Sequence, residues 1–411
     1  MVTSTLQHRR RKLHSEGMRG LKPTQGRVHR VVRTTGVTSA IALAVVLTAT
    51  AAHAAVPTAL RSTPLPCVQT NDRVNDIQIM GATAYIGGRF TQVRSAGGTT
   101  YSRAGAAAID TNTCAVLPWN PAIGGELLAI AATSQAIYLG GDFDSVDNTR
   151  RKNLAAVLPT TGQLTSFAPV VKGKVTELAT SDTRLYAAGG INSVDGQPRG
   201  KAAAFSLATG SLDTGWRPVA DRRIDGLAVS ADGTRVYLGG LFTTLNGSST
   251  GRLFAAVNPV TGALATGFVP AIRVPVTEIR AVGDRVAVAY AGGGGQLALL
   301  TNSGGLVVSG RTDGNVQAVA VYGTEIAGGG HFGNYCTTNR FPCSSADLVS
   351  RTKALSLNAT TGELTTWDPS FNSVYGVWCM AYDSATGRLF VGGDFTRAGS
   401  TGVDHLAVFQ P

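Results

Sequence analysis

Seven short stretches of the chain alternate between hydrophobic and polar residues, and they recur at intervals of roughly 50 residues. An alternation with a period of two predicts β-strands that bury one face. The stretches cover residues 74–79, 127–131, 175–179, 224–229, 276–282, 316–321 and 374–381. A regular series of this kind indicates one repeating β-structure rather than several unrelated domains.

Each alternating stretch precedes a second apolar strand that ends in a pair of glycines. The sequence Ala-Tyr-Ile-Gly-Gly-Arg-Phe at 84–90 returns as Ile-Tyr-Leu-Gly-Gly-Asp-Phe at 137–143. Further copies lie at 185–191, 236–242 and 389–395, and weaker ones at 288–293 and 326–332. A short turn such as Ala231-Asp232-Gly233 joins the two strands, so we expect each pair to form a hairpin.

Two more strands complete each predicted repeat. A third strand is expected at 154–158, 202–207, 254–258 and 354–358, and a Thr-Gly turn leads from it to a fourth strand that ends near an aromatic residue and a proline. Seven such units predict an all-β fold, a seven-bladed β-propeller of four-stranded antiparallel blades. The last repeat stops after its third strand at 405–409, so we expect residues 63–68 to complete that blade and close the ring.

The N-terminal 54 residues have a different composition. They contain nine Lys or Arg and one acid, a net charge of +8, which leaves +3 of the total +11 for residues 55–411. An uncharged apolar run at 37–52 follows, and Ala52-His53-Ala54 places small residues where signal peptidase requires them. We therefore predict a signal peptide at 1–54 and a single secreted or cell-surface propeller domain at 55–411, with an uncleaved anchor as the alternative. General secretion is favoured over twin-arginine export, which stays open.

The remaining residues carry no basic stripe with interleaved aromatic residues, so no nucleic-acid partner is expected. No transmembrane segment is expected after residue 54 either. Of the five cysteines, Cys336 and Cys343 lie close together in a glycine- and proline-containing loop, and we expect a disulfide bond between them. The pairing of Cys67, Cys114 and Cys379 stays open.

The repeat resembles those of the delta-60 repeat β-propellers of secreted bacterial proteins, and more loosely the repeats of Rax2-like cell-polarity markers. The pattern that carries the resemblance is apolar-Tyr-apolar-Gly-Gly-x-Phe-(Thr/Asp)-x-Val, followed by Ala-Ala-apolar and Thr-Gly, over residues 63–411. The resemblance implies an extracellular or surface-associated propeller with no particular reaction attached. Residues 291–310 depart most from the pattern.

Side chains for catalysis are scarce after residue 54. Only His331 and His405 remain there, which disfavours a Ser-His-Asp triad or a histidine-rich metal centre. We therefore expect a monomeric, non-catalytic binding or scaffold protein with an extracellular glycan or protein as its partner. The alternative is a secreted hydrolase that acts on polysaccharide with a pair of acids such as Asp144 and Asp147.

Three acids occupy the same place on the first strand of their repeats. They are Asp76, Glu177 and Glu278, in repeats one, three and five. If these side chains face the centre of the ring, their carboxylates converge and could hold calcium, which prefers oxygen ligands. The alternative is three solvated acids at the starts of strands. No other cofactor is expected.

Two further features are candidates for recognition. The long loop at 331–353 contains Tyr335, Arg340 and Phe341, which the expected disulfide would hold rigid for ligand binding, whereas the alternative is a tolerated insertion. An arginine also recurs just before the third strand. The recurring residues are Arg103, Arg151, Arg199 and Arg351. They suggest either a ring for an anionic polymer or, as we favour, Arg-Asp bridges that fasten loops.

Overall fold

The computed structural model describes residues 59–411 except 339 and 341. These residues belong to the compact unit Ala55–Pro411, and the signal peptide predicted at 1–54 lies outside them. Almost all described elements are β-strands, apart from the short 3-10 helix η1 (Ser345–Asp347). Within the described residues, no helix has the length and apolar character needed to cross a bilayer.

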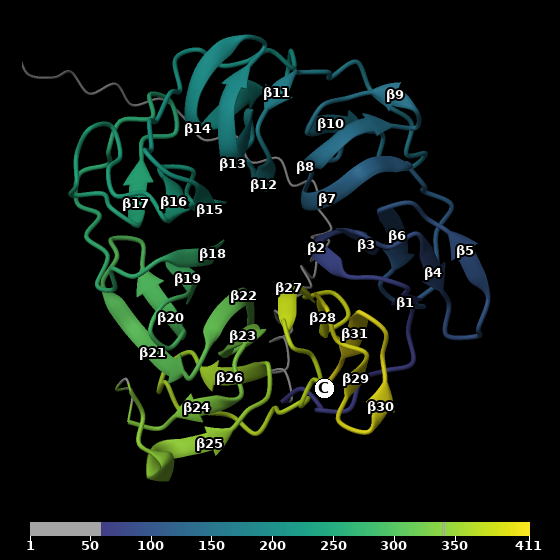
Figure 1. The fold of residues 1–411 in the computed structure, drawn as a ribbon, viewed down its shortest axis with the longest axis vertical. Helices are drawn as coiled ribbons and strands as arrows, with labels where there is room; N and C mark the ends of the chain where they lie inside the picture. The colour runs from purple at the N-terminus through teal and green to yellow at the C-terminus, as the bar shows by residue number, and fades with distance from the viewer. Residues whose placement is uncertain (1–58, 339, 341) are drawn as a thin grey trace, which may run out of the picture. The chain divides into compact units, whose positions relative to one another are not determined.

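The strands form small antiparallel sheets that follow one another around a common axis, with the first strand of each sheet innermost (Figure 1). Each predicted hairpin is present, and the third strand pairs with its second member. In inner, middle and outer order, the first three repeats contain β2 (Val74–Met80), β3 (Thr83–Gly88) and β6 (Ala106–Asp110); β7 (Ile123–Ala132), β8 (Ile137–Val146) and β10 (Leu154–Val157); and β12 (Val175–Thr180), β13 (Arg184–Val194) and β14 (Gln197–Ser206). The fourth and fifth repeats contain β15 (Ile224–Val229), β16 (Val236–Gly240) and β17 (Phe254–Val257); and β18 (Val276–Val282), β19 (Arg285–Tyr290) and β20 (Gln296–Thr301). The last two repeats contain β22 (Asn315–Tyr322), β23 (Glu325–His331) and β26 (Ala354–Asn358); and β27 (Val377–Asp383), β28 (Arg388–Gly393) and β31 (Leu406–Phe409).

The fourth strands are shorter than predicted. In most repeats the segment makes a single β-bridge to the third strand, as between Val157 and Leu164 or Leu357 and Leu364. It then leaves its own sheet, because its aromatic residue packs against the next repeat. The indole Nε1 of Trp119, for example, donates to the carbonyl oxygen of Leu158 at 3.1 Å. A full fourth strand, β21 (Leu306–Thr312), is present in the fifth repeat.

The segment that precedes the first repeat lies along the last strand. Leu65 forms the same kind of bridge to Val408, and its N–H donates to the Val408 carbonyl at 2.7 Å. The N–H of Arg61 donates to the carbonyl of Gln410 at 2.9 Å. In Figure 1 the purple N-terminal segment accordingly runs beside the yellow C-terminal strands.

The loop at 331–353 adds two strands to the sheet of the irregular fifth repeat. It contains β24 (Asn334–Cys336) and β25 (Leu348–Ser350), and β24 pairs with β21 of the preceding repeat. The result is a six-stranded sheet in the order β18-β19-β20-β21-β24-β25. The other short strands are β1 (Gln69–Thr70), β4 (Gln92–Arg94), β5 (Thr100–Ser102), β9 (Thr149–Arg150), β11 (Val171–Lys172), β29 (Arg397–Ala398) and β30 (Thr401–Gly402).

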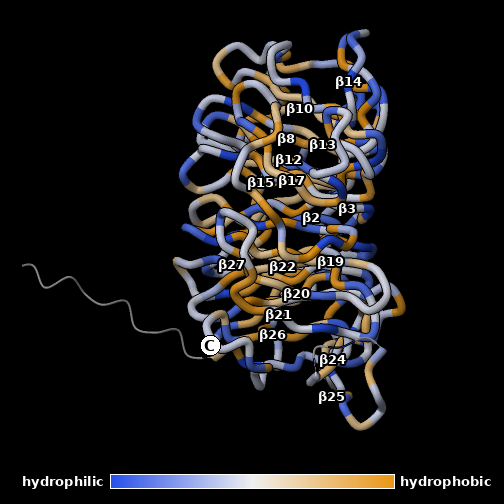
Figure 2. Tube along the Cα trace, turned by 90° about the vertical axis from the view of Figure 1, so that its left-hand side faces the viewer, coloured by the Kyte–Doolittle hydropathy of each residue, from blue (hydrophilic) through white to orange (hydrophobic). Residues whose placement is uncertain are grey.

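Hydrophobic side chains pack between neighbouring sheets. One buried cluster joins Tyr85 and Trp119 of the first repeat to Leu127 and Leu139 of the second, and the Tyr85 and Trp119 rings meet edge to face at 5.1 Å. Figure 2 shows hydrophobic residues along the strands and hydrophilic residues mainly in the connecting loops. The core is therefore a series of layers between sheets, which is how repeated units bury their faces.

The two glycines of the first pair, Gly87 and Gly88, have different structural roles. A Cβ atom on Gly87 would lie 2.5 Å from Cδ2 of Leu127 in the next sheet. A Cβ atom on Gly88 would instead lie 2.1 Å from the backbone carbonyl oxygen of Arg73, just before its own inner strand. The first glycine thus allows neighbouring sheets to approach, and the second allows the backbone within one sheet to approach.

The cysteines form two disulfide bonds. Cys336 and Cys343 are bonded as predicted, with Cα atoms 6.0 Å apart. The pairing that the sequence left open is between Cys67 and Cys114, with Cα atoms 5.2 Å apart, and Cys379 is free and buried.

Replacing the second glycine should destabilise the fold, because its Cβ would meet backbone atoms rather than a flexible side chain. We expect Gly88→Ala to lower the free energy of unfolding by at least about 2 kcal/mol in urea titrations. Gly97→Ala is the matched control, since its Cβ would have only Ser95 Oγ within reach, at 3.9 Å. Equal stability of the two variants would contradict this role.

Candidate functional site

Every inner strand contains a β-bulge at the same position. The register against the middle strand shifts by one residue there, so two residues lie opposite one. The bulged residues are Asn75, Leu128, Thr176, Asp225, Thr277, Gln317 and Trp378. The alternation of apolar and polar residues predicts the strands but not the bulges. Apolar residues remain on both sides of the added residue, so the pattern still looks like a regular strand.

The seven bulged residues all line one cavity of about 450 Å³ between the inner strands. The other polar and charged residues that line it are Arg73, Asp76, Glu177, Arg223, Glu278, Arg280 and Cys379. The strands therefore bring together side chains that are far apart in the sequence.

Several bulged residues also connect adjacent inner strands. The amide nitrogen of Asn75 donates to the carbonyl of Leu127 at 2.8 Å, and the hydroxyl of Thr277 donates to the carbonyl of Val316 at 2.7 Å. These bonds link the bulged residues to the next inner strand, so this part of the cavity wall is held by hydrogen bonds as well as by packing.

All three predicted acids, Asp76, Glu177 and Glu278, line this cavity directly after a bulge. Two of them already have backbone partners. Asp76 accepts hydrogen bonds from the N–H groups of Ile77 and Ile130 at 2.8 and 2.7 Å, and Glu278 accepts one from Val319 at 2.6 Å. In the part of the chain that the structure describes, no group of three or more His, Cys, Asp or Glu residues is arranged to hold a metal ion.

Arg280 supplies the positive charge among these acids. Its Nη2 lies 2.5 Å from Oε1 of Glu278 and 3.8 Å from Oδ1 of Asp76. The residue follows Glu278 by two positions, so both side chains project from the same face of β18. That spacing is visible in the sequence, but the pattern of equivalent acids gives no signal for Arg280 as a site residue. Calcium binding is not tested by these contacts, but the arginine disfavours it, because it already neutralises part of the charge that would attract the ion.

Burial controls the ionisation of the three acids. It raises the pKa of Glu177 well above its ordinary value, and the nearby charges of Glu278 and Asp76 raise it further. Burial also raises the pKa of Glu278 to about 7, although Arg280 opposes the change, and it raises the pKa of Asp76. Unlike the other two acids, Glu177 forms no hydrogen bond or ion pair with any described residue.

The remaining charged residues of the cavity are paired. Arg73 donates to Glu126 at 2.7 Å and its guanidinium lies 4.3 Å from the ring centroid of Trp378. Arg223 pairs with Asp225. Two buried polar atoms in the wall, Oε1 of Gln317 and Nε1 of Trp378, have no hydrogen-bond partner among the described residues.

The structure describes two of the three residues of the predicted loop site. Tyr335 is only 7% exposed, because β24 joins the sheet edge and buries the ring in a cluster with Leu357. Ligand binding by this loop stays a prediction. Arg340 is exposed, and Phe341 lies outside the described residues.

The recurring arginines fasten loops mainly through backbone carbonyls, and Arg351 also forms one of the expected bridges, to Asp368 at 3.6 Å. Nη2 of Arg103 donates to the carbonyl of Leu117 at 2.9 Å, and Nη2 of Arg351 donates to that of Thr365 at 3.0 Å. The two acids of the alternative hydrolase site also form contacts with nearby residues. Asp144 pairs with Lys152 at 2.9 Å, and Asp147 accepts the N–H of Ala122 at 2.7 Å.

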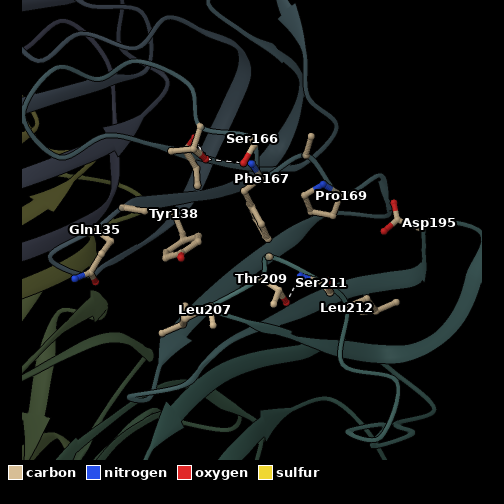
Figure 3. A pocket seen from close by; sticks show the side chains of 16 residues that line it. Gln135, Tyr138, Ser166, Phe167, Pro169, Asp195, Leu207, Thr209, Ser211 and Leu212 are labelled. Atoms are coloured by element: carbon tan, nitrogen blue, oxygen red, sulfur yellow. Dashed lines mark hydrogen bonds between the residues drawn. The ribbon is translucent and has the colours of Figure 1, made fainter.

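A second cavity, of about 440 Å³, lies between the second and third repeats and is lined by Tyr138, Phe167 and Leu212 among others (Figure 3). Phe167 occupies the place of Trp119 and Trp216 in other repeats, where the indole bonds to a carbonyl of the next sheet. The smaller ring leaves space at this position, so the cavity is explained by packing.

Comparisons with solved structures agree with the arrangement of the sheets. The WD40 β-propeller domain of Doa1 superposes with a TM-score of 0.54 at 13% identity, covering 84% of this chain and 96% of that one. The described residues have a β-propeller fold. The computationally designed Ika8 protein matches with a TM-score of 0.50 at 12% identity, over 84% of this chain and 98% of that one. No protein-family model matches the chain, and no curated protein matches it either.

Stability should fall as the pH rises through the pKa of Glu278. The folded state keeps its proton up to about pH 7, whereas the unfolded chain releases it near 4.5, so the folded state binds more protons in this window. We expect the free energy of unfolding to decrease between pH 5 and pH 8 by on the order of 2 to 3 kcal/mol from this group.

Urea titrations across this range check the effect. Glu278→Gln should reduce the decrease, because the amide cannot ionise, although Glu177, whose pKa is also raised, still contributes; Glu363→Gln at an exposed position should leave the decrease unchanged. Carboxyl groups with lowered pKa values, such as Asp221 and Asp232 at about 2, titrate below the window. An unchanged slope in Glu278→Gln would contradict the assignment.

Proposed function

We propose that this protein is an exported, seven-bladed β-propeller of the delta-60 repeat type that binds a ligand and does not catalyse a reaction. The cyclic order of the inner strands supports seven blades, since β2 lies next to both β7 and β27. Contact between the last and first repeats supports closure. A Cβ on Gly392 would lie 2.8 Å from Cγ1 of Val74, which repeats the approach of Gly87 to Leu127.

The disulfide between Cys67 and Cys114 supports closure through the N-terminal segment. Cys67 follows Leu65, which bridges to the last strand, and Cys114 follows β6 of the first repeat. The bond therefore joins the first sheet to the segment that lies along the last one. Two disulfide bonds are also consistent with export to an oxidising compartment.

The main support for a binding role is a contrast within the chain. Some positions keep the same residue type in most repeats, whereas the bulged position does not. Glycine pairs, loop arginines and buried aromatic residues recur because they have structural partners in each repeat. The bulged position is structurally equivalent in every repeat, yet its seven occupants include an amide, a carboxylate, an indole and an aliphatic side chain. A repeating framework with different residues around one polar cavity is what a specific ligand site requires.

An extracellular glycan or protein segment is the ligand class that we propose for this cavity and its mouth. Its lining contains hydrogen-bonding groups of both kinds together with Trp378, and such a mixture suits polar ligands with some apolar surface.

The two disulfide bonds should contribute unequally to stability, because the bond at the N-terminal segment closes a much longer loop. The Cys67–Cys114 bond spans 47 residues and the Cys336–Cys343 bond spans 7. From loop entropy we expect Cys67→Ser/Cys114→Ser to cost about 4 kcal/mol in unfolding free energy and Cys336→Ser/Cys343→Ser about 2.5 kcal/mol.

Limited proteolysis should also release the segment around Leu65 first in the Cys67→Ser/Cys114→Ser variant. An equal or greater loss of stability in the control pair, with the N-terminal segment still protected, would argue against this closure.

A glycan and peptide array combined with a panel of hydrolase substrates tests the binding role. We expect binding without turnover, and at least ten-fold weaker binding by Leu128→Trp, which places a larger side chain in the cavity. Leu158→Trp is the control, because Leu158 is 38% exposed and lies outside the cavity lining. Turnover of any substrate by the wild type, or ligand binding that Leu128→Trp leaves unchanged, would overturn the proposal.

A further inference from the structure

The central cavity has more carboxyl groups than cationic partners for them. Three arginines lie around it, and each is already paired: Arg73 with Glu126, Arg223 with Asp225, and Arg280 with Glu278. Asp76 lies within 3.8 Å of Arg280 and also has two backbone donors. Among the described residues around the cavity, Glu177 is the carboxyl group that forms no ion pair or hydrogen bond, although the charge of Arg280 still acts on it from a greater distance.

Glu177 differs from the two acids at equivalent positions, which both accept a backbone hydrogen bond from the next inner strand. Asp76 and Glu278 stand at the same place after a bulge, and each accepts an N–H of the next inner strand, from Ile130 and Val319. The equivalent N–H for Glu177 would be that of Leu227, and this contact is not formed among the described residues. The side chain is partly exposed and lines the cavity, so a ligand there can reach its carboxyl group.

A second, independent feature lies on other strands of the same wall. Gln317 on β22 and Trp378 on β27 each keep a buried polar atom without a protein partner. Rotation about the last side-chain bond lets the Gln317 amide present its oxygen to the cavity as an acceptor. Buried polar groups are normally hydrogen-bonded, so unpaired atoms in the wall of a cavity favour a polar occupant.

We propose that the cavity binds an organic cation whose ammonium or guanidinium group pairs with Glu177. This inference rests on the proposed function, because it assigns a ligand class to the same cavity. Arg280 provides a precedent within the protein, since its guanidinium already lies between Glu278 and Asp76. A ligand guanidinium can make the same charge-assisted hydrogen bonds to the remaining carboxylate.

A metal ion fits the same residues less well. Calcium takes six to eight oxygen ligands, whereas Asp76 and Glu278 already accept backbone N–H groups and contact Arg280. The volume of about 450 Å³ is that of a small-molecule site. An organic cation fills this space and supplies several N–H donors at once.

Agmatine, which carries both an ammonium and a guanidinium group, is a suitable probe for the purified full chain. Isothermal titration calorimetry should detect binding of agmatine but not of butylurea, its neutral counterpart, or of calcium chloride. Glu177→Gln should weaken agmatine binding at least ten-fold, and Glu363→Gln, which alters an exposed turn, should leave it unchanged.

Tryptophan fluorescence gives a second measurement that does not depend on the folding of the Glu177 variant. Trp378 lines the cavity, whereas Trp119, Trp216 and Trp367 are fully buried elsewhere. Agmatine should therefore change the emission of the wild type, and Trp378→Phe should lose most of that change. Equal affinity of Glu177→Gln and wild type, or binding of butylurea or calcium in place of agmatine, would overturn the inference.

The two proposals can fail separately. If agmatine does not bind but an array ligand does, and Leu128→Trp removes that binding, the cavity is a ligand site and only the cationic class is wrong. If agmatine binds equally to wild type and Leu128→Trp, then both the cavity and the role of Glu177 are wrong.

Discussion

The close approach of the middle strands to the inner strand of the next sheet is the constraint on which the fold depends, and it leaves room only for glycine or alanine at the point of contact. At Gly87 and Gly140 there is no room for a Cβ, because Leu127 and Val175 of the following sheet occupy that space. The same approach brings Val74 of the first repeat against Gly392 of the last one. Tyrosine hydroxyls add polar links across the same gap, as from Tyr85 to the carbonyl of Pro159 at 3.0 Å.

The bulges connect this packing to the candidate site. The second glycine leaves room for the carbonyl of the residue before the inner strand, as Gly88 does for Arg73, and the strand bulges two residues later, at Asn75. A bulged side chain is released from the alternation that buries its neighbours, so its identity is free to differ between repeats. The framework therefore explains both the recurring glycines and the variable cavity wall.

The predictable part of the structure is the part where local pattern and packing agree. Alternation and glycine pairs predict the hairpins, and close spacing predicts the Cys336–Cys343 bond. The fourth strands are shorter because Trp119 and its equivalents pack against the next repeat, which local propensity does not report. Tyr335 is buried because β24 pairs with a strand of another repeat. Asp76, Glu177 and Glu278 converge because they occupy equivalent positions in their repeats. The position of Arg280 between two of these acids depends on the direction of its side chain in space.

The charges of the cavity oppose the stability of the framework that surrounds it. Burial raises the pKa values of Glu177 and Glu278, which means that their ionised forms are costly in the folded state. Glutamine would keep most of the shape without that cost, and the framework needs no charge at these positions, since Ala129 and Ala318 stand there in other repeats. Carboxyl groups in a position where the fold accepts alanine are better explained by a ligand than by folding.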